Sequence, residues 1–494
     1  MSIEKKDLGF IGLLKSFTQP FWIASIMELF ERWAWYGLFA VLALYLNGST
    51  DEGGLGFSHI ERGEIMSYVT FILYLLPIIT GAISDKIGYK SSLIIAYLLL
   101  GFGYYFMGDV TSYYAVFIMF LVVAVGAAMF KPVASAIVTK STDERNSSFG
   151  FGVFYMMVNV GGFFGPLLSG KLRDEYGWKI VFIMATSAIA VNLILVLFFF
   201  KEPNREKSNE SFGKTILKSL INIWEALSDM KLTMLLLIMV GFWVMFNQLF
   251  YTLPVFIEEW VNTKPLFESL HGVLPGIADF YKNKDGGINP EQIVNMDAFF
   301  IVILQMIIST IILKWKPISA MMTGIIIAIV GIALSFYTDN IFFTIFGILI
   351  FAIGEMTSNP KFSDYIAKIS PKGKEALYMG TYFLPIAFAN LLTKWITGDL
   401  YASMSDKVVF IREELADRSI LLPEITDEYT KNDFYAEAAE KLNMGADQMT
   451  TFLWDKYHPG NIWFVIAGIG LLTIIGLLIY NSVLNKSNKG AKTA

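Results

Sequence analysis

The sequence has no cysteine and only three histidines among its 494 residues. Without cysteine, the chain can form no disulfide bond and has no thiol to act as a nucleophile or a metal ligand. The histidines, His59, His271 and His458, are scattered through expected loops and span ends, and their spacing is not that of a metal site. We also find no nucleophile–base arrangement and no phosphate-binding loop. The sequence therefore predicts no metal centre, no enzyme and no nucleic-acid partner.

Charged residues are also scarce, since they make up 16% of the chain against 55% hydrophobic residues. The mean hydropathy of +0.55 implies more apolar surface than the core of a water-soluble protein could bury. A helix that crosses a bilayer needs about 20 predominantly apolar residues, and such stretches recur along almost the whole chain. We therefore predict an all-α integral membrane protein.

Apolar runs separated by polar or helix-breaking residues predict about 12 membrane-spanning helices. The polar segment 201–231 leaves six predicted spans on either side, so we interpret it as a cytoplasmic linker. It would join an N-terminal six-helix bundle, residues 1–200, to a C-terminal six-helix bundle, residues 232–494. The predicted spans cover residues 21–46, 64–83, 91–108, 113–138, 150–169, 180–200, 234–257, 298–314, 318–337, 341–359, 376–397 and 461–483.

Lysine and arginine gather in alternate loops and near both ends of the chain, which predicts cytoplasmic termini. We expect a multi-pass protein of a bacterial-type inner, or plasma, membrane. Two long insertions, at about 258–297 and 398–460, would then face outward. The second shows helical patterning, so we expect short helices packed as a cap. A role of the insertions in substrate capture or partner contact is the alternative.

The first predicted span carries three charges, on Glu28, Glu31 and Arg32. Together with Trp35 and Tyr36, these residues follow the spacing i, i+3, i+4, i+7 and i+8, which forms one face of a helix. A charge at the centre of a span costs about 2.5–3.5 kcal/mol on insertion scales. This face must therefore look into the bundle or into a water-filled cavity.

Lys131 lies in the fourth predicted span, next to Pro132, and a carboxylate of the first span is its natural partner. Two carboxylates and two cations compete for partners, so proton uptake at one carboxylate can release a cation for a substrate. We therefore predict that Glu28, Glu31, Arg32 and Lys131 take part in proton coupling. A purely structural set of ion pairs is the alternative.

Glu355 lies in the tenth predicted span, shortly before Asn359 and Pro360. A carboxylate in apolar surroundings can bind a proton or face the ammonium group of a ligand. We therefore predict a binding or coupling role for Glu355. A structural ion pair with a lysine such as Lys361 is the alternative.

A short loop between the second and third predicted spans has the pattern GxxxDxxGxK, with Gly81, Asp85 and Gly88 as its first three fixed positions. It resembles the loop signature of the major facilitator superfamily. The resemblance implies a gating contact between helices rather than a substrate site.

Several motifs together resemble one branch of that superfamily, the proton-dependent oligopeptide transporters. The segment from Glu28 to Gly37 resembles the family's first-helix ExxER motif with its trailing tyrosine and glycine. Other segments match in the family's order: Lys131-Pro132 resembles the fourth-helix lysine, Phe151 to Gly161 the fifth-helix signature, Phe242 to Gln248 the seventh-helix motif, and Glu355 with Asn359-Pro360 the tenth-helix acid and proline.

This resemblance implies the facilitator fold of inverted repeats, with the substrate between two bundles and transport by alternating access. The family carries di- and tripeptides and uses the proton gradient, without a bound cofactor. Carried over, Arg32 and Lys131 would hold the peptide carboxylate, and Glu355 would hold the ammonium group. The remaining predicted substrate-binding residues are Tyr36, Tyr74, Asn159 and Asn247.

The pocket departs from the family pattern at several positions. In the first span, Trp35 replaces a tyrosine and Phe39 replaces an arginine. The seventh-helix acid is Asn247, the eighth-helix asparagine is Asp297, and an eleventh-helix tryptophan is Tyr382. The pocket has therefore lost one cation and moved one acid.

We expect a secondary active transporter that moves di- or tripeptides, or peptide-like solutes, together with protons. Its partners would be the substrate, protons and the lipid bilayer. A carrier of another small organic or inorganic anion is one alternative. A membrane sensor that keeps the fold without transporting is the other.

Overall fold

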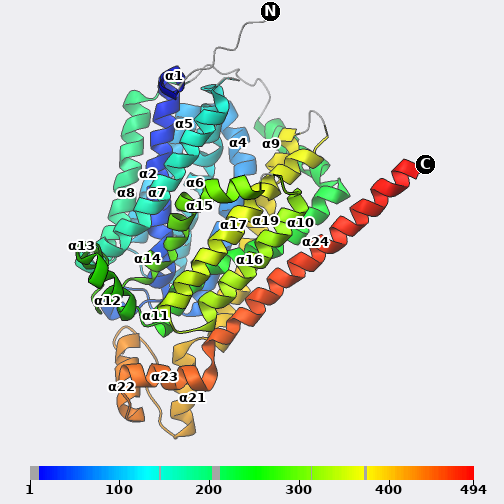
Figure 1. The fold of residues 1–494 in the computed structure, drawn as a ribbon. Coiled ribbons are helices and arrows are strands. Elements are labelled where there is room, and N and C mark those ends of the chain that lie inside the picture. The colour runs from blue at the N-terminus through cyan, green and yellow to red at the C-terminus, as the bar shows by residue number, and fades with distance from the viewer. Residues whose placement is uncertain (1–9, 144–145, 203–211, 313, 372–374, 494) are drawn as a thin grey trace, which may run out of the picture. The chain divides into compact units, whose positions relative to one another are not determined.

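The computed structural model describes residues 10–143, 146–202, 212–312, 314–371 and 375–493. Within these ranges the chain is almost wholly helical and forms no β-strand (Figure 1). Helices satisfy all backbone hydrogen bonds within one segment, as a bilayer requires. The all-α prediction is confirmed.

Nine helices of the described ranges are long and apolar enough to cross a membrane. They correspond to the third to tenth predicted spans and to the twelfth. They are α5 (Tyr89–Met107), α6 (Tyr113–Lys140), α7 (Ser147–Tyr176), α8 (Lys179–Ile194) with a π-helical end η2 (Leu195–Phe199), α10 (Met230–Tyr251), α15 (Met296–Ile312), α16 (Pro317–Tyr337), α17 (Ile341–Ile369) and α24 (Ile462–Thr493).

The other three predicted spans are also helical, and two of them are interrupted. The first is one helix, α2 (Gln19–Asn47), which follows the short α1 (Phe10–Ser16). The second divides into α3 (His59–Leu75) and α4 (Pro77–Ile87), because a proline favours the first position of a new helix. The eleventh consists of α18 (Glu375–Gly380), α19 (Phe383–Lys394) and the π-helical η3 (Trp395–Leu400).

The chain falls into two compact units, which we describe separately. The units follow contacts within the fold rather than membrane spans. The predicted bundles at 1–200 and 232–494 therefore stay a prediction. Unit 1 comprises Met1–Phe39, Ile72–Ser169 and Lys179–Asn222, and unit 2 comprises Ala40–Phe71, Gly170–Trp178 and Ile223–Ala494.

Glycines let the helices of unit 1 approach one another closely. A Cβ atom added to Gly126 of α6 would lie 2.9 Å from the carbonyl oxygen of Ala96 in α5. A Cβ atom on Gly161 of α7 would lie 2.9 Å from Cβ of Arg32 in α2. Small residues at such contacts are typical of membrane helices. The α7 glycines therefore fix the charged face of α2 against its neighbour.

The closest packing in unit 2 joins α16 and α17, which each carry two glycines seven residues apart. A Cβ atom on Gly354 would lie 2.5 Å from the backbone nitrogen of Ala328, and one on Gly324 would lie 2.6 Å from the carbonyl oxygen of Gly354. Bulkier residues would push the two backbones apart. This contact holds α17, the helix of Glu355, at a fixed height along α16.

Both insertions are helical, and they lie in unit 2. In the second insertion three short helices pack on one another, so its predicted helical character is confirmed. Thr430 caps one of them, because its Oγ accepts from the backbone N–H of Asp433 at 3.2 Å while the Asp433 carboxylate accepts from the backbone N–H of Thr430 at 3.0 Å. The shorter elements are η1 (Thr50–Glu52), α11 (Leu253–Trp260), α12 (Lys264–Val273), α13 (Pro275–Tyr281), α14 (Pro290–Val294), α20 (Tyr401–Met404), α21 (Lys407–Asp417), α22 (Lys431–Leu442), α23 (Ala446–Tyr457) and η4 (Pro459–Asn461).

The predicted linker 201–231 contains one helix, α9 (Phe212–Leu227), while its residues 203–211 lie outside the described ranges. Leu217, Leu220, Ile221 and Trp224 are exposed on α9, and their spacing places them on one face. An exposed apolar face of this kind is typical of a helix that lies along a membrane surface.

Candidate functional site

The predicted site residues fall into two groups, one in each unit. Unit 1 contains the first-span charges and the polar groups predicted around them, and unit 2 contains the remaining two substrate-binding candidates. The unit 1 group is Glu28, Glu31, Arg32, Tyr36, Tyr74, Lys131 and Asn159, and the unit 2 group is Asn247 and Glu355.

Arg32 is bound by both carboxylates of its own helix. Its guanidinium forms an ion pair with Glu31, to which Nε donates a hydrogen bond of 2.5 Å. The same Nε lies 3.5 Å from Oε1 of Glu28. All three residues are buried. Oε1 of Glu31 has no hydrogen-bond partner among the described residues, so this carboxylate retains an acceptor for a further donor.

Lys131 of α6 faces an aromatic ring instead of the expected carboxylate. Its Nζ lies 4.7 Å from the ring centroid of Tyr74, where the negative face of the ring attracts an ammonium group. Within the described ranges Lys131 forms no ion pair, although the charges of Glu28 and Glu31 act on it over a longer distance. The structure thus brings Tyr74 to Lys131 and leaves the ammonium group able to accept an anionic partner.

Pro132, next to Lys131, explains a hydrogen bond between α4 and α6. A proline inside a helix has no N–H to donate to the carbonyl four residues earlier, which here is that of Ala128. The hydroxyl of Thr80 in α4 donates to this carbonyl at 2.6 Å. Gly81 packs beside the proline, because a Cβ atom there would lie 3.5 Å from Cβ of Pro132. The break in α6 is therefore satisfied by α4, the helix that follows Tyr74.

Tyr36 and Asn159 also lie in unit 1. The guanidinium carbon of Arg32 lies 5.6 Å from the ring centroid of Tyr36, and Tyr36 is 37% exposed. The amide nitrogen of Asn159 donates to the carbonyl oxygen of Tyr155 at 2.8 Å, within its own helix. Tyr36 thus belongs to the charged group, whereas the described contact of Asn159 is a local one.

Asn247 is held in a buried polar network of unit 2. Its amide nitrogen donates to Oδ1 of Asn390 and to Oγ1 of Thr393, both at 3.1 Å. Tyr251 donates to the same Oδ1 of Asn390 at 2.7 Å and lies 2.8 Å from the hydroxyl of Thr70. In this arrangement the amide group links α10 to α19 rather than pointing free into a pocket.

Asp297 and Glu355 form a second group of carboxylates on neighbouring helices, α15 and α17. Their charges act on each other, and Asp297 is 3% exposed. Oδ1 of Asp297 and Oε2 of Glu355 have no hydrogen-bond partner within the described ranges. Asp297 lies in the first turn of α15, where the helix dipole favours an anion. The proposed alternative partner, Lys361, donates instead to the carbonyl oxygen of Trp315 at 3.5 Å.

The predicted gating loop lies where α4 ends and α5 begins. Gly88 has φ of 102°, a conformation that residues with a Cβ atom rarely adopt. The backbone N–H of Tyr89 donates to Glu202 at 2.8 Å, and Nζ of Lys90 donates to the carbonyl oxygen of Leu197 at 3.0 Å. The side chain of Asp85 lies outside what the structure describes.

A buried charged cluster in unit 2 was not predicted, and we call it the His59 cluster. Nε2 of His59 lies 3.4 Å from Oε1 of Glu259 and 3.6 Å from Oδ2 of Asp406. Lys431 lies 3.0 Å from Oε1 of Glu259, and the Tyr401 hydroxyl donates to its Oε2 at 2.9 Å. The cluster consists of His59, Arg62, Glu259, Tyr401, Asp406 and Lys431. Its members come from distant segments whose local patterns do not distinguish them from surface charges.

The two central charges of the cluster stabilise each other. Burial alone would raise the pKa of Glu259, but Lys431 and His59 outweigh burial and hold that pKa well below its ordinary value. Burial would lower the pKa of Lys431, but its charged and phenolic neighbours, Glu259 among them, raise it. Both groups are therefore charged at neutral pH.

The cluster resembles a metal site in spacing, because ligand atoms of His59, Glu259 and Asp406 lie within 4.8 Å of one another. The ammonium group of Lys431 already neutralises Glu259 at 3.0 Å. A divalent cation would be repelled by this ammonium group and by the nearby guanidinium of Arg62. We therefore interpret the cluster as a charge network rather than a metal centre.

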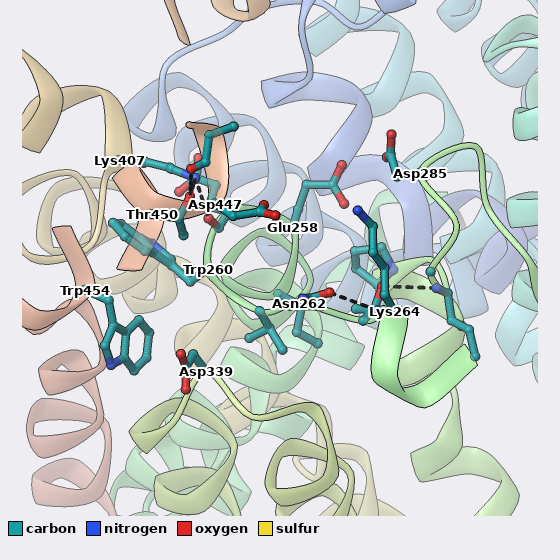
Figure 2. Close-up of a pocket in the computed structure, with 18 of the residues that line it drawn as sticks. Glu258, Trp260, Asn262, Lys264, Asp285, Asp339, Lys407, Asp447, Thr450 and Trp454 are labelled. Carbon is teal, nitrogen blue, oxygen red and sulfur yellow. Dashed lines mark hydrogen bonds between the residues drawn. The ribbon is translucent and has the colours of Figure 1, made fainter. Parts of the chain in front are cut away.

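A cavity of about 440 Å³ lies beside the cluster and has Glu259 in its lining. Figure 2 shows Lys407 and Thr450 close together on one side of this cavity, with Lys264 on the other. Nζ of Lys407 donates to Oγ1 of Thr450 at 2.6 Å and to the carbonyl oxygen of Glu259 at 3.1 Å. The cavity gives water a route to one edge of the cluster.

Curated relatives of the chain include named transporters. It is 32% identical over 194 residues to the uncharacterised transporter YclF of Bacillus subtilis (strain 168), and this match covers 38% of the chain but only 37% of YclF. It is 23% identical over 442 residues to dipeptide and tripeptide permease A of Escherichia coli (strain K12), which covers 78% of the chain and 85% of the permease. The match to YclF therefore spans little more than a third of that protein.

Solved structures share the fold over almost the whole chain. A POT family transporter in complex with 5-aminolevulinic acid has a TM-score of 0.65 at 18% identity and covers 97% of this chain and 100% of its own. A peptide transporter POT in complex with sulfate has a TM-score of 0.62 at 18% identity and covers 95% and 99%. These matches confirm the predicted fold class and the resemblance seen in the motifs.

The family model described as Major Facilitator Superfamily matches residues 21–393, which is well over half of the chain. The apolar helices and the shared fold agree with this match. The chain is therefore a multi-pass membrane protein that belongs to the major facilitator superfamily.

Proposed function

We propose that the protein is a proton-coupled symporter of di- or tripeptides, or of peptide-like solutes. The observation that carries this proposal is the complementary charge of its two units. Unit 1 offers a half-buried ammonium group, that of Lys131, without an ion pair in the described ranges. Unit 2 offers the carboxylates of Asp297 and Glu355, each with an oxygen that lacks a hydrogen-bond partner there. A short peptide carries both complementary groups, a carboxylate of the kind that an ammonium binds and an ammonium of the kind that carboxylates bind.

Lys131 is the better candidate for the carboxylate end of the ligand. Arg32 is already held by Glu31 and Glu28, so a ligand would have to compete with two carboxylates for it. Lys131 rests against the Tyr74 ring, and an anion would replace a weak contact with a charge-assisted hydrogen bond. We assign Lys131 as the first contact of the carboxylate.

Proton coupling follows from the competition around Arg32. Protonation of Glu31 would remove the partner that binds the guanidinium most closely. Arg32 would then be available to join Lys131 on the ligand carboxylate, so that proton and ligand bind best together. This coupling uses Glu28, Glu31, Arg32 and Lys131, as the sequence predicts, and needs no bound cofactor. We propose transport alone for these residues and no catalysed reaction.

The relatives support the substrate class, since several are named dipeptide and tripeptide permeases. We further propose that the protein lies in a bacterial-type inner membrane with both termini in the cytoplasm. The acids of unit 2 disfavour the alternative of a plain anion carrier, because they would repel an anion that brings no positive group.

The proposal is tested by uptake into proteoliposomes. Purified protein is reconstituted, and uptake of radiolabelled dialanine is measured with an inward proton gradient and after a protonophore has collapsed it. We expect concentrative uptake that requires the gradient. Lys131→Ala should lower uptake by about 100-fold, which corresponds to about 2.7 kcal/mol, within the range for a hydrogen bond to a charged group.

The matched control is Lys171→Ala, which removes a lysine paired with Glu175 at the surface and should leave uptake within about twofold, as expected for a surface ion pair. Uptake that is unchanged by collapse of the gradient would contradict the coupling. Binding of a simple anion but not of dialanine would contradict the substrate class.

A further inference from the structure

We propose that the cavity beside the His59 cluster is a binding site for small organic cations with primary ammonium groups, and that Glu258 is the carboxylate that receives one of these groups. The cavity lies wholly in unit 2, and residues of both insertions line it. This end of the unit faces outward in the predicted topology. The proposal concerns binding outside the membrane spans, so it does not depend on the transport of peptides.

The cavity has a surplus of negative charge. Its lining contains five carboxylates and two ammonium groups, those of Glu258, Glu259, Asp285, Asp339, Asp447, Lys264 and Lys407. Lys431 matches Glu259 from outside the lining, and the charge of Asp447 acts on Lys407. The other three carboxylates of the lining form no ion pair within the described ranges. A positively charged ligand would therefore be attracted to this cavity.

Glu258 lies among charges of its own sign. Its side chain reaches the water of the cavity, but the protein crowds the carboxyl group, and this burial raises its pKa to about 7. Arg173 of α7 acts to lower that pKa, whereas the charges of Glu291, Asp285 and Glu52 act to raise it. Three carboxylates face Glu258 for one guanidinium, so an ammonium group in the cavity would supply the missing positive charge.

Arg173 is already engaged with partners other than Glu258. Its Nη1 lies 3.5 Å from Oε1 of Glu291, and its Nε lies 3.5 Å from Oδ1 of Asp174. Its Nη2 donates to Oδ1 of Asn289 at 2.7 Å. Glu291 is 1% exposed, and neither of its carboxylate oxygens has a hydrogen-bond partner in the described ranges. The guanidinium therefore neutralises neither Glu291 nor Glu258 fully, which favours a further cation at this wall of the cavity.

The size and the walls of the cavity favour an organic cation over a metal ion. Its volume of about 440 Å³ is that of a small-molecule site. Trp260 and Trp454 line it, and the face of an indole ring attracts an ammonium group. Figure 2 shows Asp447 on one side and Asp285 on the other, with Glu258 between them. Within the described ranges, no three acids of the lining hold their oxygen atoms close enough together for a metal ion.

The test uses cadaverine, a five-carbon diamine that lacks the carboxylate of a peptide. Its binding to the full chain in detergent is measured by isothermal titration calorimetry at pH 8. We expect binding, and Glu258→Gln should weaken it about tenfold, because the ligand loses a charged acceptor. Glu268→Gln is the matched control, since Glu268 is an exposed acid of the same insertion outside the lining, and it should bind within about twofold of wild type. No binding by wild type, or equal binding by Glu258→Gln, would overturn the proposal.

The pH dependence gives a readout that a purely structural role would not produce. With a pKa of about 7, Glu258 is mostly protonated at pH 6 and mostly ionised at pH 8, so cadaverine should bind about tenfold more tightly at pH 8. A primary amine titrates near pH 10.4 and stays charged at both values. Lys407, whose pKa burial lowers to about 8, is retained in Glu258→Gln. An equal pH dependence in wild type and Glu258→Gln would therefore overturn the role of Glu258.

Two further variants fix the place of the ligand. Asp339→Asn changes another wall of the cavity and should also weaken binding, which keeps the test valid if Glu258→Gln folds poorly. Glu355→Gln removes the ammonium acceptor proposed for the transport path. Loss of cadaverine binding in Glu355→Gln, with binding retained in Glu258→Gln, would overturn the proposal and place the ligand within the spans.

Two further ligands fix its chemical class. Dilysine presents primary ammonium groups on a peptide, and its binding should also weaken in Glu258→Gln. The tighter binder of the two, cadaverine or dilysine, shows whether a free amine or a cationic peptide fits the site. Calcium chloride supplies a divalent cation without ammonium groups, and tighter binding of calcium than of either organic ligand would overturn the proposal in favour of a metal site.

Discussion

Two groups of carboxylates in unit 2 differ in the cations around them. In the His59 cluster, Glu259 is contacted by Lys431 and the Tyr401 hydroxyl. On α15 and α17, Asp297 and Glu355 act on each other and have unpartnered oxygens in the described ranges. A buried carboxylate whose charge is matched within the protein makes the fold depend on its cation, whereas one left unmatched is available to a proton or a ligand. The same residue type therefore has different consequences in the two places.

The largest expected effect on stability comes from removing the cation of the matched group. Lys431→Met leaves Glu259 buried without its ammonium partner, which should lower the free energy of unfolding by about 3 kcal/mol. Thermal unfolding in detergent measures this loss. Lys441→Met changes an exposed lysine of the same helix and should have little effect. Equal melting temperatures for Lys431→Met and wild type would remove the distinction between the two groups.

The unmatched group should show the opposite pattern. Glu355→Gln is expected to reduce dipeptide uptake by about 100-fold, because the ligand ammonium loses a charged acceptor worth about 2–3 kcal/mol. The melting temperature should stay the same or rise, because a half-buried charge that pairs with no cation in the described ranges is removed. Uptake into proteoliposomes and thermal unfolding are measured on the same preparation. A variant that unfolds more easily and transports normally would show that Glu355 is structural.

Asp297→Asn tests the second acid of the unmatched group. It relieves the interaction of two like charges and should stabilise the protein by about 1–2 kcal/mol, while Glu355 still receives the ligand ammonium. Uptake of dialanine should therefore fall far less than in Glu355→Gln. Thermal unfolding and a comparison of the two uptake rates check this. A loss as severe as that of Glu355→Gln would place both carboxylates on the ligand.

The smallest expected effect is on thermal stability in acid, where the ion pair of Glu259 is lost. The pKa of Glu259 is held below its ordinary value, so its contribution to stability is complete above about pH 4.3 and is lost as the pH falls toward the folded-state pKa. Glu259→Gln should be less stable than wild type at pH 5, and the difference in melting temperature should narrow by pH 3.5. A difference that widens between these two values would have the wrong sign for an ion pair with Lys431.

The sequence was sufficient to predict the elements that depend on local composition. Apolar length located α6 and α17, and the spacing of Glu28, Glu31 and Arg32 predicted a charged helix face that the structure contains. These features follow from residues within a few turns of one another. The bilayer allows few alternatives to a helix for such segments.

Contacts between distant segments could not be predicted in the same way. Lys131 was expected to pair with a first-span carboxylate, but its ammonium group lies over the Tyr74 ring. That choice depends on the relative height and rotation of two helices, which the sequence of neither helix determines. The His59 cluster joins residues up to 372 positions apart, from His59 to Lys431, so no local pattern could show it.

The bond between Thr80 and the Ala128 carbonyl has a mechanical consequence. In a membrane-spanning helix the carbonyl that a proline frees needs another partner, because the bilayer core offers no water. Here the freed carbonyl is tied to the adjacent helix, and any hinge motion of α6 at Pro132 must pull α4 with it or break that bond. A motion of α6 at Pro132, the residue after Lys131, would therefore be transmitted to α4 and to the short loop that follows it.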